Sequence, residues 1–215
     1  MHCLSPLRFI KAGILALSLG ALSADPAAPR IVVIDPGHGG NDSGTTFKDH
    51  EEKDVVLAVA RKLAEILEEE GKNPVLTRQA DDSVSLQDRA AAGSAEVFCF
   101  LSLHLHSIDE ETAKGIVIFL PKRGRDNAAA SLAIATHLKQ TLEATAHRPK
   151  VVIRQSADFV LENTACPALV INLGHLVSSG GDQDLLELKV QQDLATALGK
   201  GIDLAIKQPT GAEIR

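Results

Sequence analysis

The sequence has 215 residues, of which 45% are hydrophobic and 23% are charged, and this suits one globular domain with a sizeable core. Only 3% of the residues are aromatic, with neither Trp nor Tyr, and the formal net charge is −6. This composition argues against a nucleic-acid-binding protein, which needs stacking side chains or a basic face.

Residues 1–23 are typical of a secretory signal peptide. Arg8 and Lys11 form a basic region, the apolar run at 12–21 is short for a bilayer span, and small residues follow at 21–23. Removing this segment takes away two positive charges and no negative one, so the mature chain would carry −6 − 2 = −8. We expect a secreted protein of the periplasm or cell envelope, without a stable membrane anchor after processing; a retained anchor is the alternative.

After a linker at residues 24–30, strand and helix patterns alternate from residue 31 to residue 207. Apolar runs predict strands at residues 31–35, 74–77, 96–103, 115–120 and 167–171. Apolar residues at helical spacing predict a helix from residue 55, and a Ser-x-x-Asp box predicts a helix start at residue 85. Two more helices are predicted over residues 127–146 and 182–207. The alternation predicts an α/β fold: a single three-layer domain with a mostly parallel or mixed sheet of about six strands and helices on both faces. Residues 208–215 form a tail.

The cysteines are Cys3, inside the predicted signal peptide, and Cys99 and Cys166, in or beside apolar runs. We expect Cys99 and Cys166 to be buried thiols. A disulfide remains open, because an exported protein meets an oxidising environment.

Polar residues follow several predicted strands, and ligands of such folds collect at the carboxyl ends of strands. His38 lies in a glycine-rich turn after the first strand, Glu51 and Glu52 open the next helix, and His104 and His106 follow the central strand. Two imidazoles and a carboxylate are suitable ligands for a catalytic zinc with an open fourth position.

Each residue also has an ordinary structural interpretation. The turn could be a phosphate loop, but Asp42 stands where the third glycine of G-x-G-x-x-G belongs. A single histidine is more often structural, and Glu51 or Glu52 could simply complement a helix dipole. Their joint placement after several strands favours the metal site.

Five stretches occur in a characteristic order: IVVIDPGHGGNDSGT, EKDVVLAVARKLAEIL, VLTRQADDSVSLQDRAAAGS, FLSLHLHS and PALVINLGHL. In this order they resemble the zinc-dependent N-acetylmuramoyl-L-alanine amidases over residues 31–207. The resemblance implies cleavage of the amide between N-acetylmuramic acid and the L-alanine of the peptidoglycan stem peptide, in cell-wall remodelling. It also implies a Zn²⁺ cofactor held by His38, Glu52 and His104, with peptidoglycan as the partner and no nucleic acid.

The chain departs from the family pattern where such amidases carry a glutamate at the end of the last strand. Here that position is Asn172, and His175 and His106 replace the usual Phe and Asn. Because an amide cannot accept and return a proton, an alternative is a catalytically impaired relative that binds zinc and peptidoglycan without efficient cleavage. Other possibilities are that His175 or His106 substitutes as the base, or that Glu162 reaches the site.

Overall fold

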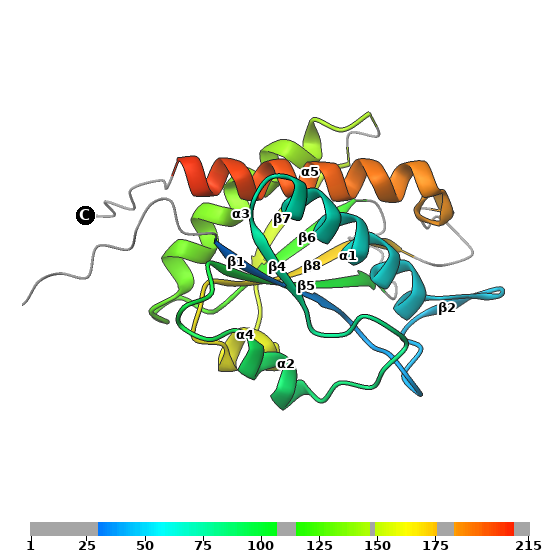
Figure 1. The fold of residues 1–215 in the computed structure, drawn as a ribbon, viewed down its shortest axis with the longest axis horizontal. Coiled ribbons are helices and arrows are strands. Elements are labelled where there is room, and N and C mark those ends of the chain that lie inside the picture. Colours follow the sequence, from blue (N-terminus) through cyan, green and yellow to red (C-terminus); the bar gives the residue numbers. More distant parts are fainter. Residues whose placement is uncertain (1–29, 107–114, 147–148, 176–182, 209–215) are drawn as a thin grey trace, which may run out of the picture.

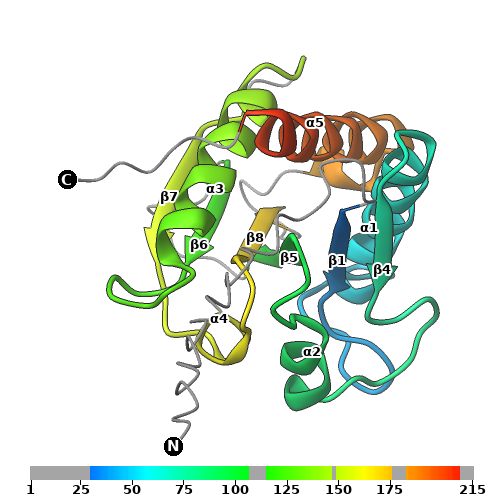
Figure 2. The same cartoon turned by 60° about the vertical axis from the view of Figure 1, so that its left-hand side comes forward.

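The computed structural model describes residues 30–106, 115–146, 149–175 and 183–208. They form a six-stranded sheet in the order β4-β1-β5-β8-β6-β7, shown edge-on between its helices in Figure 2. The strands are β1 (Ile31–Pro36), β4 (Asn73–Leu76), β5 (Cys99–His106), β6 (Ile116–Leu120), β7 (Val151–Gln155) and β8 (Ala168–His175). The predicted six-stranded α/β sheet is therefore confirmed.

The sheet is mixed. Strands β4, β1, β5 and β8 run parallel, whereas β6 is antiparallel to β8 and β7 is parallel to β6. The carboxyl ends of β1, β5 and β8 consequently meet at one edge, while β6 and β7 end at the opposite edge.

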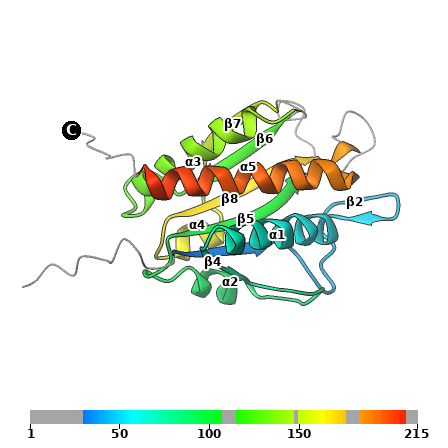
Figure 3. The same ribbon diagram turned by 45° about the horizontal axis from the view of Figure 1, so that its top comes forward.

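Helices cover both faces of the sheet (Figures 1 and 3). Three long helices pack on one face: α1 (Glu52–Glu69), α3 (Ala128–Glu143) and α5 (Leu188–Lys207). Two short helices, α2 (Leu86–Ala92) and α4 (Phe159–Asn163), pack together on the other face. A hairpin of β2 (Thr46–Phe47) and β3 (His50–Glu51) precedes α1, and the 3-10 helix η2 (Gln183–Leu186) precedes α5.

Side chains along β5 alternate between the large core on one face of the sheet and the face that carries α2 and α4. Leu101 and Leu103 lie in the large core beneath the long helices. Phe100 lies in the smaller core under α4, and Ser102 and His104 follow it on that same face. Polar groups therefore reach the surface where the short helices leave the sheet uncovered.

Two strands extend further than the sequence predicts. Strand β8 continues to His175, because a bulge lets His175 pair with His106 of β5, so Asn172 lies inside the strand rather than after it. Strand β5 likewise contains His104 and His106. Strand β7 and helix α4 were not predicted.

Cys99 and Cys166 are buried free thiols, as expected. The predicted signal peptide (1–23), nearly all of the linker (24–30) and the tail beyond residue 208 lie outside the described residues. Within the described part of the chain, no helix is long and apolar enough to cross a bilayer.

Candidate metal centre

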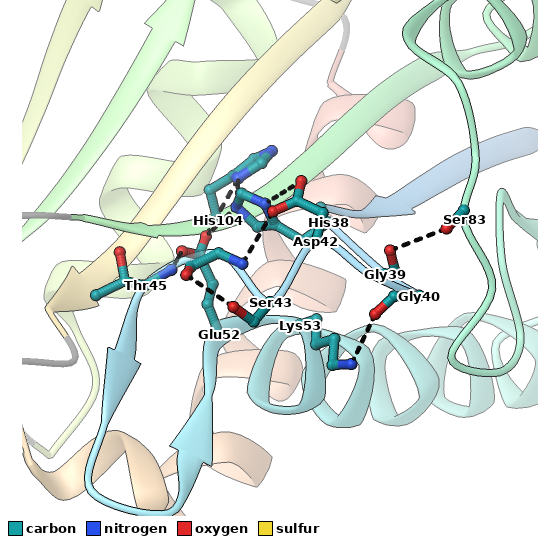
Figure 4. Close-up of polar contacts among 12 residues, drawn as sticks. His38, Gly39, Gly40, Asp42, Ser43, Thr45, Glu52, Lys53, Ser83 and His104 are labelled. Atoms are coloured by element: carbon teal, nitrogen blue, oxygen red, sulfur yellow. Dashed lines mark hydrogen bonds and ion pairs between the residues drawn. The ribbon is translucent and has the colours of Figure 1, made fainter.

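Three predicted ligands converge at the edge where the parallel strands end (Figure 4). His38 lies in the turn after β1, Glu52 is the first residue of α1, and His104 lies in β5. Nε2 of His38 is 3.0 Å from Oε1 of Glu52, and Nδ1 of His104 is 3.2 Å from each of these atoms. The three donor atoms thus form a nearly equilateral triangle.

The triangle fits a tetrahedral zinc. Ligands held about 2.0–2.1 Å from such an ion are separated by about 3.3 Å, close to the 3.0–3.2 Å found here. Two imidazole nitrogens and one carboxylate oxygen form the donor set of many catalytic zinc sites, in which the fourth position stays open.

Glu52 is held as a carboxylate although its side chain is only 2% exposed. Burial by itself would raise the pKa of Glu52, but hydrogen bonds from His104, His38 and the backbone N–H groups of Leu105 and Thr45 lower it well below its usual range. The hydrogen bond to Glu52 in turn is the largest influence raising the pKa of His38. The pocket therefore supplies the negative charge that a dication requires.

Asp42 orients His38. Its Oδ2 lies 2.8 Å from Nδ1 of His38, on the side of the ring away from the triangle, and this hydrogen bond is the largest influence lowering the pKa of Asp42. A carboxylate on the second nitrogen of a ligating imidazole fixes the ring and its tautomer. The spacing of four residues between His38 and Asp42 is the sequence signal for this contact.

Asp35 anchors a buried polar network beneath the site. It accepts hydrogen bonds from Oγ1 of Thr77 (2.5 Å), Nη1 of Arg89 (2.5 Å) and Oγ of Ser102 (2.7 Å). The fully buried carboxylate is thus compensated by one guanidinium and two hydroxyl groups.

Two buried arginines hold the turn that carries His38. Arg89 donates to the carbonyl oxygens of Pro36 and His38, and Arg78 donates to those of Pro36 and Gly37. The backbone of His38 has a φ of 58°, a left-handed conformation that costs a non-glycine residue about 1–2 kcal/mol. The two arginines offset this cost by donating hydrogen bonds to the carbonyl groups of residues 36–38. They thereby fix the backbone that carries the His38 imidazole.

Glycine is required where the turn passes the candidate ligands. A Cβ on Gly37 would overlap the ring of His104, and a Cβ on Gly44 would lie 2.6 Å from Cδ2 of His38 and 2.7 Å from Oε2 of Glu52. Gly44 also has a φ of 64°. The glycine-rich sequence therefore allows the backbone to approach the three candidate ligands closely.

The triangle opens into a cleft of about 810 Å³ on the face that carries α2 and α4. The floor of the cleft is formed by β5, β8 and β6, through Ser102, Val170 and Phe119 among others. Its rim includes Leu86 of α2 and Phe159 of α4. A cleft of this volume is of the size that binds small ligands in proteins.

The other predicted site residues are placed differently. Asn172 lines the cleft and pairs in register with His104 on the neighbouring strand. His175 is 1% exposed and, among the described residues, is not part of the cleft lining. Glu162 lies in α4 outside that lining, 3.5 Å from Arg125. The roles predicted for Asn172 and His175 remain predictions.

Comparison with known proteins gives the same family as the sequence motifs. The profile of the N-acetylmuramoyl-L-alanine amidase family matches residues 32–204. The chain is 31% identical over 192 residues to the YqiI protein of Bacillus subtilis, covering 88% of this chain and 92% of YqiI. It is 33% identical over 175 residues to the probable cell wall amidase LytH of Staphylococcus saprophyticus, covering 80% of this chain but only 56% of LytH.

A solved structure agrees with these relatives. The crystal structure of an N-acetylmuramoyl-L-alanine amidase from Clostridium difficile 630 superposes with a TM-score of 0.74 at 29% identity, covering 83% of this chain and 97% of that one. The chain therefore belongs to the N-acetylmuramoyl-L-alanine amidase family.

Proposed function

We propose that this chain is a zinc-dependent peptidoglycan amidase, which hydrolyses the amide between the lactyl group of N-acetylmuramic acid and the L-alanine of the stem peptide. The observation that carries this proposal is the triangle of His38, Glu52 and His104, with zinc-like donor separations and an open side on the cleft. Family membership supports the amidase activity and peptidoglycan as substrate.

A zinc ion held by these residues would polarise the scissile carbonyl and lower the pKa of an attacking water to about 7. The chain's own residues prepare the site. Asp42 fixes the His38 ring, the two arginines fix the turn, and β5 presents His104 toward the floor of the cleft. A substrate lying along the β8 side of the floor would pass Asn172.

Proton transfer is the step that this site performs least well. Asn172 can hydrogen-bond to a water or carbonyl, but it cannot take the proton of the attacking water and return it to the leaving amine. Loss of such general acid–base help typically costs about 10²–10⁴ in rate. This observation favours a second candidate function, an impaired relative that binds peptidoglycan with slow cleavage.

Metal analysis of the purified protein tests the zinc site. We expect about one zinc per chain, and a lower content in His38→Ala and Glu52→Gln, with His137→Ala as a control because His137 lies on α3, away from the triangle. A folded wild-type protein that contains no zinc and binds none on titration would refute the site.

Digestion of isolated peptidoglycan separates the two functions. If Asn172→Glu releases stem peptides much faster than wild type, the missing carboxylate limits the reaction. If wild-type release is lost in His175→Ala but kept in His106→Ala, then His175 is the substitute base. Sedimentation of wild type with insoluble sacculi, without release of stem peptides, would establish the binding function.

We also infer that the protein acts outside the cytoplasm, in the periplasm or cell envelope. Support comes from the predicted signal peptide at residues 1–23 and from membership of a family whose relatives include probable cell wall amidases. N-terminal sequencing of the exported protein, expected to begin near residue 24, tests this inference.

A further inference from the structure

The end of the cleft remote from the metal triangle has its own chemical character. Asp158 precedes α4 and is exposed, and Phe159, 37% exposed, follows it; both line the cleft. The carboxylate of Asp158 does not cap α4 and, within the described part of the chain, has no hydrogen-bond or ion-pair partner. An available carboxylate thus stands beside an accessible aromatic ring.

The other acidic groups of the cleft are already engaged. Asp35 is paired with Arg89, Asp42 with His38, and Glu52 with the two histidines. Among the described residues that line the cleft, Arg89 is the one Lys or Arg side chain, and it is bound to Asp35 and to backbone carbonyls. Asp158 is therefore the cleft carboxylate left to meet a positive charge on a ligand.

The span from the triangle to Asp158 follows from strand register. Asn172, beside His104, is level with Val117 of β6, and three residues further along β6 the carbonyl of Leu120 accepts a hydrogen bond from Ser156. Three strand residues cover about 10 Å, and Asp158 is two residues beyond Ser156, so the span is on the order of 10–15 Å. An extended peptide covers about 3.3–3.6 Å per residue, so the side chain of the third residue reaches this far from the scissile amide.

We propose that Asp158 and Phe159 form a subsite for the free side-chain ammonium group of a diamino acid at the third position of the stem peptide. The carboxylate pairs with the ammonium group, and the ring of Phe159 packs against the aliphatic part of that side chain. This inference rests on the proposed function, because that function orients the peptide along the cleft. The subsite selects stems whose amine is free over stems in which cross-linking has converted it to an amide.

Binding of product peptides tests the subsite without relying on catalysis. The probes are the tripeptide L-Ala-γ-D-Glu-L-Lys and its Nε-acetyl-lysine counterpart, which lack the scissile amide and cannot be cleaved. Their dissociation constants are measured on the zinc-loaded full chain by NMR titration. Because an exposed ion pair contributes modestly, we expect the lysine peptide to bind about two- to fivefold more tightly, with the preference falling as salt is raised.

Asp158→Asn is expected to abolish this preference by weakening the lysine peptide alone. The matched control is Glu162→Gln, which removes a carboxylate from α4 itself, four residues after Asp158 and outside the cleft, and should keep the preference. Equal binding of both peptides to wild type, no binding of either, or a preference that persists in Asp158→Asn would overturn the subsite. The proposed function fails by a separate result, the absence of stem-peptide release from sacculi.

Discussion

Replacing Arg89 by Met tests how strongly the turn around His38 depends on its buried support. The guanidinium of Arg89 bonds the carboxylate of Asp35 at 2.5 Å and the carbonyl oxygens of Pro36, His38 and Val84 at 2.9, 2.6 and 3.2 Å. Methionine fills much of the same volume but leaves a fully buried carboxylate without its cation.

Removing one partner of a buried ion pair typically costs about 3–5 kcal/mol of unfolding free energy. We expect a loss of this size for Arg89→Met, a large fraction of the roughly 5–15 kcal/mol that stabilises a typical domain. Urea denaturation in the presence of a chelator measures the loss without a contribution from bound zinc. If Arg89→Met does not fold, Arg89→Lys, which keeps the charge and loses the forked geometry, gives the smaller but still measurable loss.

The matched control is Arg61→Met. Arg61 is exposed and donates to the carbonyl of Gln79, so its replacement should change the unfolding free energy by no more than about 0.5 kcal/mol. A loss below about 1 kcal/mol for Arg89→Met, or equal losses for the two variants, would refute the reasoning that the Asp35–Arg89 pair supports the turn.

Three further predictions concern the same region and the core. Gly44→Ala should reduce both stability, measured by denaturation, and zinc affinity, measured by titration, because the new Cβ crowds the side chains of His38 and Glu52. Gly124→Ala, with positive φ but no atom within 4 Å, should affect stability alone. Asp42→Ala should weaken zinc binding about 10–100-fold with little loss of fold, and unchanged affinity would contradict its orienting role. Burial raises the pKa of Cys166 to about 11 and so favours the neutral thiol in the folded state. The contribution of this neutral thiol to folding stability should be lost as pH rises from about 9 through 11. Alkylation of Cys166 in the native protein at about pH 8 should be slow. Rapid alkylation of the folded protein at that pH would show that the thiol is accessible.

The central elements of the fold were predictable because their side chains follow strong patterns. Strand β8 is fully buried, β5 is buried from Cys99 to Leu103, and both are nearly continuous apolar runs there. Helix α1 repeats apolar residues at helical spacing. Strand β7 was missed because it lies at the sheet edge with its last residues exposed, and α4 because it has only five residues. The ends of β5 and β8 were placed too early because polar residues inside a strand resemble a strand end.

The convergence of His38, Glu52 and His104 was predictable because each residue belongs to a recognisable motif. The buried pair that supports the His38 turn was not predictable. Arg89 and Asp35 are separated by 54 residues, and only the folded chain shows that they meet. Asp158 was missed for a similar reason: it precedes a short helix that the sequence does not reveal, and its position in the cleft depends on how β6 and β7 run.

The measurement that tests the central claim most directly is digestion of purified peptidoglycan by the mature protein, with the released products identified by mass spectrometry. With zinc present, we expect free stem peptides that begin with L-alanine, formed slowly because the amide of Asn172 cannot accept and return a proton. We expect none after chelation or in Glu52→Gln. Release that continues at the same rate after complete removal of zinc, or products cleaved at another bond, would contradict the account.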